Sequence, residues 1–222
     1  MTSGTSDDSS GAASGGVPGA PTLRGRHVEL VPLAPEHAPG LLAAATADRT
    51  TFGFTEVPAT TAHMDRYIAN LVARGAAGTD LPFAQRLVHG HHEGRLVGCT
   101  RFLEIRRWRM RPEPDEVEIG GTWLTADTQR TPVNTEAKVL LLTHAFEVWR
   151  VGRVAIATDA RNERSRVAIE RLGASFEGIL RHNRPSLVPG EEGRARDTAL
   201  FSITDDDWPA VKAVLHTRLA AG

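Results

Sequence analysis

Apolar residues along this chain fall into two kinds of run, which together predict a fold with strands and helices. Short apolar or alternating runs that end at glycine, proline or polar turns are typical of β-strands. Strands are expected at residues 27–33, 83–89, 95–105, 116–124, 153–159, 175–181 and 197–203. Apolar residues that recur at helical spacing indicate amphipathic helices. Helices are expected at residues 35–47, 59–74, 132–150, 160–172 and 205–219.

The order of these elements predicts the class of fold. Consecutive strands followed by a strand–helix–strand unit imply an α+β (mixed α/β) fold, in which a mostly antiparallel mixed sheet contains one parallel pair. We expect that pair at residues 116–124 and 153–159, with the helix at residues 132–150 as the crossover and helices on both faces. Parallel neighbours that diverge at their carboxyl ends leave a crevice where ligands bind. The polar turn at residues 125–131 should lie at its mouth.

The start of the helix at residues 132–150 is a candidate anion-binding site. Thr131 can cap the helix, Pro132 suits its first position, and the helix dipole favours the negative charge of Glu136. The first N–H groups of a helix have no partner within the helix and can bind an anion. An ordinary junction between a strand and a helix, which binds nothing, has the same local pattern.

Composition narrows the class of protein. The 222 residues are 41% hydrophobic and 24% charged. We therefore expect one domain at residues 22–222, after a flexible tail rich in serine, glycine and alanine at residues 1–21. The net charge of −1 gives no basic field for a nucleic-acid partner. No apolar run is long enough for a membrane span and no secretory signal is recognised, so a cytoplasmic protein without a membrane partner is expected.

Cysteine, histidine and the arginine-rich segment suggest little chemistry. The single cysteine, Cys99, lies in a strand-like run and is expected to be buried and inert, as in a reducing compartment. His89, His91 and His92 fall in a hairpin turn without a second group of ligands, so no metal is expected. The arginines at residues 101–111 could attract an acidic peptide or RNA, but a solvated hairpin end is favoured.

Four stretches of the chain, residues 23–42, 118–147, 159–174 and 178–209, carry a family resemblance. They resemble the GNAT superfamily of acyl-CoA N-acyltransferases, and most closely its RimJ/RimL-like branch. The second stretch is the strand, turn and helix described above, and the third is similar to the family's Asn-x-x-Ser helix that ends in a Leu-Gly pair. The resemblance covers nearly all of the chain outside the tail and implies a GNAT-like fold with a splayed parallel pair.

The resemblance also implies a reaction. Such an enzyme transfers an acetyl group from acetyl-CoA, its co-substrate, to a primary amine by direct attack on the thioester. The amine would be a protein N-terminus or a small molecule, no metal is implied, and a homodimer is open. Two alternatives remain: a non-catalytic acyl-CoA-binding or regulatory module, and an acyltransferase that uses a larger donor such as succinyl-CoA.

The resemblance assigns a set of residues to CoA. The family cradles the CoA pyrophosphate with a Gln/Arg-x-x-Gly-x-Gly/Ala turn, which here has Pro132 and Asn134 at the two small positions. Pro132 has no N–H to donate, and Asn134 adds a side chain where the backbone should approach phosphate. We still expect a diphosphate site, with Arg130 more important than usual. The expected CoA-binding residues are Trp123, Leu124, Thr125, Gln129, Arg130, Thr131, Val133, Asn134, Thr135, Asn162 and Ser165.

Two of these residues match positions with defined roles in the family. Asn162 matches the residue that bonds the pantetheine arm, although it can also serve only as the N-cap of the helix that follows. Ser165 matches a serine thought to act in this branch as the acid for the departing CoA thiolate. Other members use a tyrosine where this chain has Ile169, and Tyr67 is expected in the core.

The proposed reaction needs a base, an oxyanion donor and an acceptor cleft. Candidates for the base are Glu118, Asp159 and Glu104, and a water relay is also open. A backbone N–H from residues 123–125 is the expected oxyanion donor. Because side chains alternate along a strand, Glu118 should face away from Trp123. The acceptor cleft should be walled by residues 50–54, the second helix and a long, mobile loop around residues 182–196.

Overall fold

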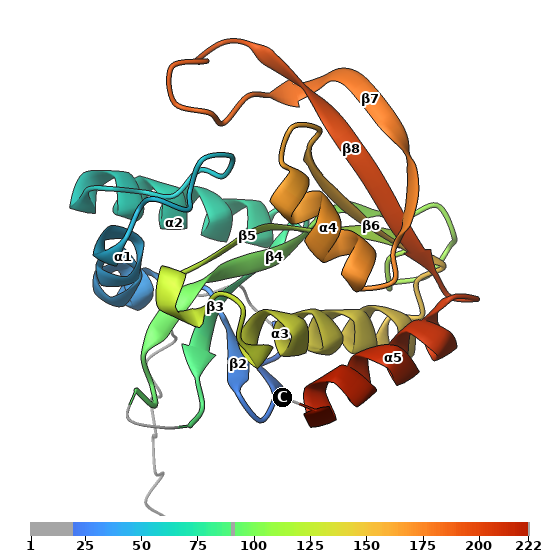
Figure 1. The fold of residues 1–222 in the computed structure, drawn as a ribbon. Coiled ribbons are helices and arrows are strands. Elements are labelled where there is room, and N and C mark those ends of the chain that lie inside the picture. The colour runs from blue at the N-terminus through green and yellow to red at the C-terminus, as the bar shows by residue number, and fades with distance from the viewer. Residues whose placement is uncertain (1–19, 90–91, 222) are drawn as a thin grey trace, which may run out of the picture.

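The structure, a computed structural model, describes residues 20–89 and 92–221 (Figure 1). The predicted tail lies outside these residues except for Ala20 and Pro21. The strands are β1 (Leu23–Arg24), β2 (Val28–Pro32), β3 (Leu81–Leu87), β4 (Leu96–Arg106), β5 (Glu116–Leu124), β6 (Arg153–Asp159), β7 (Ser175–Pro185) and β8 (Ala195–Thr204). The helices are α1 (Ala38–Ala47), α2 (Thr61–Ala76), α3 (Pro132–Thr143), α4 (Glu163–Arg171) and α5 (Trp208–Ala221). Short helical turns are η1 (Pro35–His37), η2 (Ala126–Thr128) and η3 (His144–Val148).

The strands form one mixed sheet in the order β1-β2-β3-β4-β5-β6-β8-β7. Every neighbouring pair is antiparallel except β5 and β6, which run parallel with α3 in their crossover. This confirms the predicted fold class. The parallel pairing runs from Glu116 opposite Arg153 to Ile119 opposite Ile156. Residues 120–124 of β5 and 157–159 of β6 lie beyond it, and we call the opening between them the fork.

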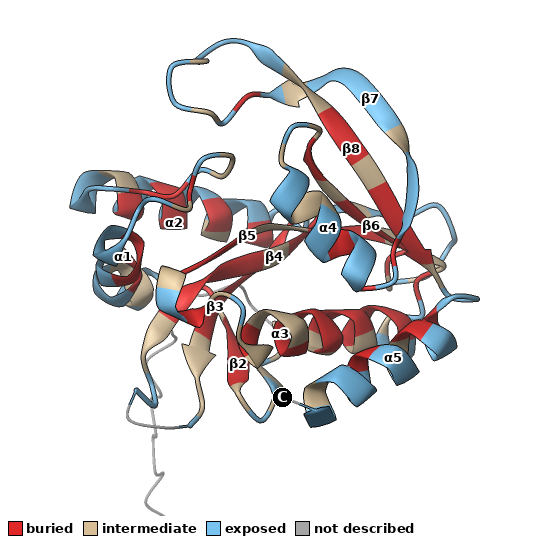
Figure 2. Ribbon diagram, in the orientation of Figure 1, coloured by how far each residue is buried: buried red, intermediate tan, exposed pale blue. Residues whose placement is uncertain are grey.

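Helices cover both faces of the sheet, as predicted (Figure 1). On one face, β5 residues Val117 and Ile119 share an apolar cluster with Leu141 and Leu142 of α3, and α5 joins the same cluster. On the other face, residues of α1 and α2 form a second cluster with Trp123. Figure 2 shows that the buried positions of the helices lie toward the sheet. The sheet therefore separates two cores, with the fork between them.

A β-bulge in β5 changes which side chains share a face. Cys99 pairs with Trp123 and Arg101 with Gly120, so β5 has one more residue than β4 over this stretch. Gly121 within it has φ 58°, which glycine adopts without strain. The extra residue shifts the alternation by one position, so Glu118 and Trp123 lie on the same face. The prediction that Glu118 faces away from Trp123 was therefore wrong.

The hairpin of β7 and β8 is longer than predicted. β7 continues to Pro185 and β8 begins at Ala195, so the predicted long loop is reduced to residues 186–194. Ser186 donates its N–H to the carbonyl of Arg194 at 2.8 Å, and its hydroxyl bonds Glu191 at 2.5 Å. The expected loop at residues 182–196 was thus wrong at both ends. Most of β7 is exposed, so its sequence lacks the apolar alternation that marks a strand.

Candidate active site

The turn from β5 into α3 lies at the mouth of the fork. Thr131 is the N-cap of α3 and accepts a hydrogen bond from the Val133 N–H, and Pro132 is the first helical residue. Both observations confirm the predicted start of the helix. Arg130 has φ 64°, which turns the backbone sharply before the helix. No acceptor within the described residues takes the N–H groups of Arg130, Thr131 or Asn134, so they are available to an anion.

The side chain of Asn134 belongs to the same turn. Its Oδ1 atom is buried and has no hydrogen-bond partner within residues 20–89 and 92–221. Buried polar atoms are nearly always paired, and this oxygen is an acceptor, so it lacks a donor and does not itself bind an anion. An amide carries two N–H donors besides its oxygen. The donors in this turn therefore fit the diphosphate of CoA, although the two small residues of the family turn are absent.

Gln129 braces the turn within the protein. Its Nε2 atom donates to Thr51 Oγ1 and to the carbonyl of Leu124, both at 2.9 Å, and its Oε1 atom accepts from Arg164. These bonds join the loop after α1, the end of β5 and the start of α4. The side chain that the resemblance assigned to phosphate is thus already engaged by three protein partners.

The end of β5 presents one backbone N–H toward the fork. Thr125 donates its N–H to the carbonyl of Val97 on the β4 side at 2.8 Å, so it is not a free oxyanion donor. The N–H and C=O groups of successive strand residues point to opposite edges. The groups of Leu124 therefore point toward β6, in agreement with the bond from Gln129 to the Leu124 carbonyl. Of the predicted residues 123–125, Leu124 has the N–H best placed for a ligand in the fork.

On the other side of the fork, Asn162 and Ser165 begin α4. Asn162 Oδ1 accepts the Ser165 N–H at 3.1 Å, which confirms the N-cap interpretation. The NH₂ group of Asn162 makes no hydrogen bond with the described residues, so it remains free to donate. Ser165 is half-buried in the first turn of the helix. The two residues are thus placed together at the end of β6, as the sequence predicted.

The two buried candidate bases are held by arginines. Glu118 is 4% exposed and forms a two-pronged ion pair with Arg184 of β7, at 2.8 and 2.6 Å. Asp159 accepts from the Arg161 N–H at 2.9 Å and from its guanidinium at 2.8 Å. The guanidinium of Arg161 holds the pKa of Asp159 below its usual range. The third candidate, Glu104, is exposed.

Replacing Arg184 with methionine is expected to destabilise the protein by roughly 2 kcal/mol, because the buried carboxylate of Glu118 would lose its partner. Urea unfolding measures the change. The double variant Glu118→Gln with Arg184→Met is the control, since it removes the charge as well and should recover most of the loss. A single variant as stable as the wild type would show that this ion pair does not hold β7 to β5.

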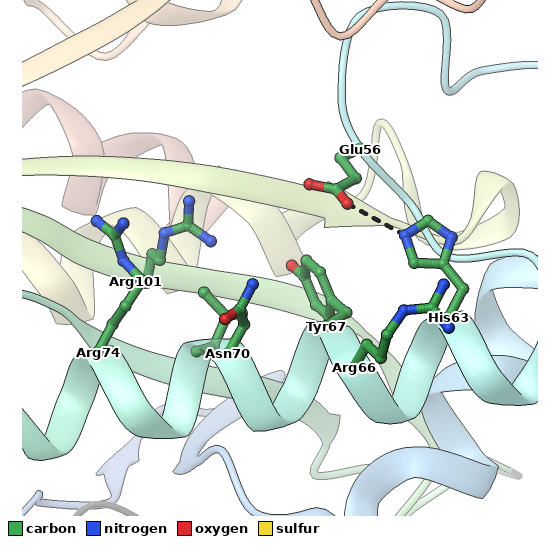
Figure 3. A pocket seen from close by; sticks show the side chains of 8 residues that line it. Glu56, His63, Arg66, Tyr67, Asn70, Arg74 and Arg101 are labelled. Atoms are coloured by element: carbon green, nitrogen blue, oxygen red, sulfur yellow. Dashed lines mark hydrogen bonds and ion pairs between the residues drawn. The ribbon is translucent and has the colours of Figure 1, made fainter.

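A polar pocket lies on the α2 face of the sheet (Figure 3). Its volume is about 320 Å³, and its lining residues are Glu56, His63, Arg66, Tyr67, Asn70, Leu71, Arg74 and Arg101. Figure 3 shows Glu56 and His63 at one end and Arg74 and Arg101 at the other. Tyr67 is buried in the same cluster as Trp123, which confirms its predicted place in the core. The sequence analysis named the second helix as a wall of the acceptor cleft but did not pick out these residues, because polar residues on an exposed helix face look the same whether or not they line a cavity.

The single cysteine of the chain lies in the core. Cys99 is 2% exposed, and burial raises the pKa of its thiol to about 12, which confirms a buried, inert cysteine. In the part of the chain that the structure describes, no three His, Cys, Asp or Glu residues gather as a metal site requires. His91 lies outside that part. None of the described helices has the length and apolar character needed to cross a bilayer.

Comparison with known proteins decides the family. The model of the acetyltransferase (GNAT) domain matches residues 27–175. The chain belongs to the GNAT acetyltransferase family. This is the family that the four stretches of sequence resemble. The matched residues include the fork, the turn before α3 and the N-cap of α4, so the family match covers the candidate site.

Individual relatives agree with the predicted RimJ/RimL-like branch. "Putative ribosomal N-acetyltransferase YdaF" of Bacillus subtilis (strain 168) is 26% identical over 121 residues, which is 54% of this chain and 60% of YdaF. The chain thus matches less than two thirds of that relative. A solved "putative acetyltransferase" from T. thermophilus is 36% identical with a TM-score of 0.72, covering 89% of this chain and 96% of its own. Mycobacterium smegmatis RimJ in complex with CoA-disulfide shares the fold, with 22% identity, a TM-score of 0.70 and coverage of 86% and 88%.

Proposed function

We propose that the protein transfers an acetyl group from acetyl-CoA to a primary amine by direct attack on the thioester. The observation that carries this proposal is the fork between β5 and β6, which opens beside the free amides at the start of α3. Such a site suits a ligand with a narrow arm and an anionic group. RimJ of Mycobacterium smegmatis, which shares the fold, was solved with a CoA-disulfide.

In this proposal the start of α3 holds the CoA diphosphate. The N–H groups of Arg130, Thr131 and Asn134 donate to it, the NH₂ group of the Asn134 side chain donates as well, and the Arg130 guanidinium adds a positive charge. Val133 and Thr135 extend the same turn and complete the predicted set there. Gln129 acts by bracing this turn, because its amide is already engaged.

The pantetheine arm would then enter the fork between β5 and α4. Asn162 at the start of α4 supplies a donor on one side of the arm, and the carbonyl of Leu124 at the end of β5 lies on the other side. Trp123 and Thr125 flank Leu124 and shape that side of the fork. The polar pocket lies on the α2 face, next to the bulge of β5, and would hold the acceptor amine.

The chemistry follows from these positions. The amine nitrogen bonds to the acetyl carbon, the carbon–sulfur bond breaks, and the nitrogen loses one proton. The Leu124 N–H stabilises the negative oxygen that develops on the acetyl carbon. Ser165 relays a proton to the departing thiolate, since a serine hydroxyl is too weak an acid to act alone. We assign removal of the amine proton to Glu118, through a water, because Glu118 lies on the face of the sheet that carries the pocket.

Release of free CoA thiol in the presence of acetyl-CoA and an amine tests this function. A panel of small primary amines and short peptides with free N-termini should contain acceptors that accelerate release above the rate without amine. Binding of acetyl-CoA without turnover for any amine would instead support a non-catalytic module. Faster release from succinyl-CoA than from acetyl-CoA would support a larger donor.

Replacing Arg130 with alanine is expected to weaken CoA binding about tenfold, because one charge-assisted contact to the diphosphate is lost. Calorimetry with CoA measures the dissociation constant. Arg106→Ala is the matched control, since Arg106 lies beside Glu116 at the far end of β5 and should leave the affinity unchanged. Equal affinities of Arg130→Ala and wild type would remove Arg130 from the diphosphate site.

A further inference from the structure

The arginines of the polar pocket have donors that the protein does not use. Arg101 is mostly buried, with 21% of its side chain exposed, and its two terminal nitrogens make no hydrogen bond with the described residues. Its Nε atom is fully buried and lies 3.2 Å from Asp80 Oδ2 without the geometry of a hydrogen bond. Arg66 forms neither an ion pair nor a hydrogen bond within the same residues. Arg66 is exposed, whereas Arg101 forms its ion pair with Asp80 through Nε alone, so the terminal nitrogens of Arg101 keep donors that an anion in the cavity can take.

The neighbouring carboxylates do not fill this role. Asp80 is buried and gives its hydrogen-bonded oxygen to Arg74 at 2.8 Å. Glu56 lies 3.1 Å from His63 Nε2 at the other end of the pocket. Glu104 is exposed and makes neither an ion pair nor a hydrogen bond with the described residues, and Glu118 is paired with Arg184. Asp80 is thus the one described carboxylate paired with Arg101, through Nε, and none bonds its terminal nitrogens.

Arg101 also lies next to the reacting end of the fork. A methyl group built on Gly121 would come within 2.9 Å of Arg101 Cζ, so the guanidinium rests on the bulge of β5. The positive φ of Gly121 and this close approach both require glycine there. An anion held by Arg101 would therefore lie a short distance from an amine that reaches the fork.

We propose that the polar pocket binds an anionic group of the acceptor, so that the preferred substrate is a primary amine carrying a carboxylate or phosphate a few bonds from its nitrogen. This proposal rests on the proposed acetyl transfer. Arg101 is the main contact, with Arg66 at the rim. The volume of about 320 Å³ is at the small end of ligand pockets and suits a small molecule or the first residues of a peptide. The two sources share the same chemistry, and the test separates them.

Matched acceptors that differ only in charge test the proposal. The small-molecule pairs are glycine with glycinamide and O-phosphoethanolamine with ethanolamine, and the peptide pair is Gly-Asp-Gly-amide with Gly-Asn-Gly-amide. The readout is the ratio of kcat/KM for the anionic and neutral members, compared between wild type and variants. The two acceptors of a pair also differ in the basicity of their amines. This difference is the same for every variant, so it cancels when the ratios of variants are compared. Arg101→Gln should lower the ratio about tenfold, Arg66→Gln should lower it less, and Arg107→Gln should leave it unchanged.

The outcomes separate this proposal from the function on which it rests. An effect in the small-molecule pairs alone assigns the pocket to a free anionic amine, and an effect in the peptide pair alone assigns it to an acidic N-terminus. If amines are acetylated but the kcat/KM ratio is the same in wild type, Arg101→Gln and Arg66→Gln, the proposal of an anionic acceptor is overturned. The proposed acetyl transfer is then still supported. If no amine is acetylated, calorimetry with O-phosphoethanolamine still decides. Binding that Arg101→Gln weakens supports the anion site, and absence of binding to the wild type overturns it.

Discussion

Replacing Glu136 with alanine should lower the free energy of unfolding by roughly 4 kcal/mol, because three backbone donors lose a charged acceptor. The Glu136 carboxylate is 7% exposed and accepts the N–H groups of Arg26, His27 and Val28 at 2.8, 2.6 and 2.9 Å. It thereby ties the first turns of α3 to the connection between β1 and β2. Urea unfolding monitored by tryptophan fluorescence measures the loss.

The Glu136 prediction has two controls. Glu136→Gln keeps the shape and one acceptor oxygen but removes the charge, so its loss should be smaller than that of alanine. Glu170→Ala removes an exposed carboxylate of α4 and should change stability little. If Glu136→Ala costs less than Glu136→Gln, the carboxylate does not anchor α3. The sequence interpretation, in which Glu136 acts on the helix dipole, was incomplete because its partners are more than 100 residues away.

Replacing Lys138 with methionine should stabilise the protein at low pH and much less at high pH. Lys138 is 6% exposed in α3, its ammonium donates to Thr122 Oγ1 at 2.7 Å, and burial lowers its pKa to about 7. The unfolded chain keeps this lysine protonated up to a pKa of about 10.4. Between these values the unfolded state binds more protons, so wild-type stability rises with pH. The methionine variant lacks this rise.

Urea unfolding at pH 6 and pH 9 tests the Lys138 prediction. Lys138→Met should raise the free energy of unfolding more at pH 6 than at pH 9, by roughly 3 kcal/mol. This difference corresponds to about two pH units over which the unfolded chain holds one proton more than the folded protein. Lys212→Met is the control, because Lys212 is a partly exposed lysine that lies beside Glu147. A gain from Lys138→Met that is the same at both pH values would show that Lys138 keeps its charge in the folded protein.

The parts of the fold that sequence could predict are those in which a buried face repeats regularly. Residues 116–124 and 153–159 were predicted as strands with the bounds that β5 and β6 have. Both are apolar runs that end at turns, so the pattern of apolar residues and the turn residues indicate the same strand ends. The start of α3 was also correct, because Thr131 and Pro132 carry a local capping signal.

The parts that sequence could not predict depend on contacts between distant residues. The bulge at Gly121 reversed the expected relation of Glu118 and Trp123; the pair Gly120–Gly121 is compatible with a bulge, but only the pairing with β4 shows the extra residue. The ion pair of Glu118 with Arg184 joins residues 66 apart. Gln129 was assigned to phosphate by resemblance, but its bond to Thr51 spans 78 residues. The family could thus be predicted, whereas the partners of the side chains in the candidate site required the fold.

The crystal structure of the protein with acetyl-CoA tests the central proposal most directly. The expected density places the diphosphate against the N–H groups of Arg130, Thr131 and Asn134, the pantetheine arm in the fork between Leu124 and Asn162, and the acetyl group toward the polar pocket. Density for acetyl-CoA at another surface, or an α3 turn that stays free of ligand at saturating acetyl-CoA, would contradict it.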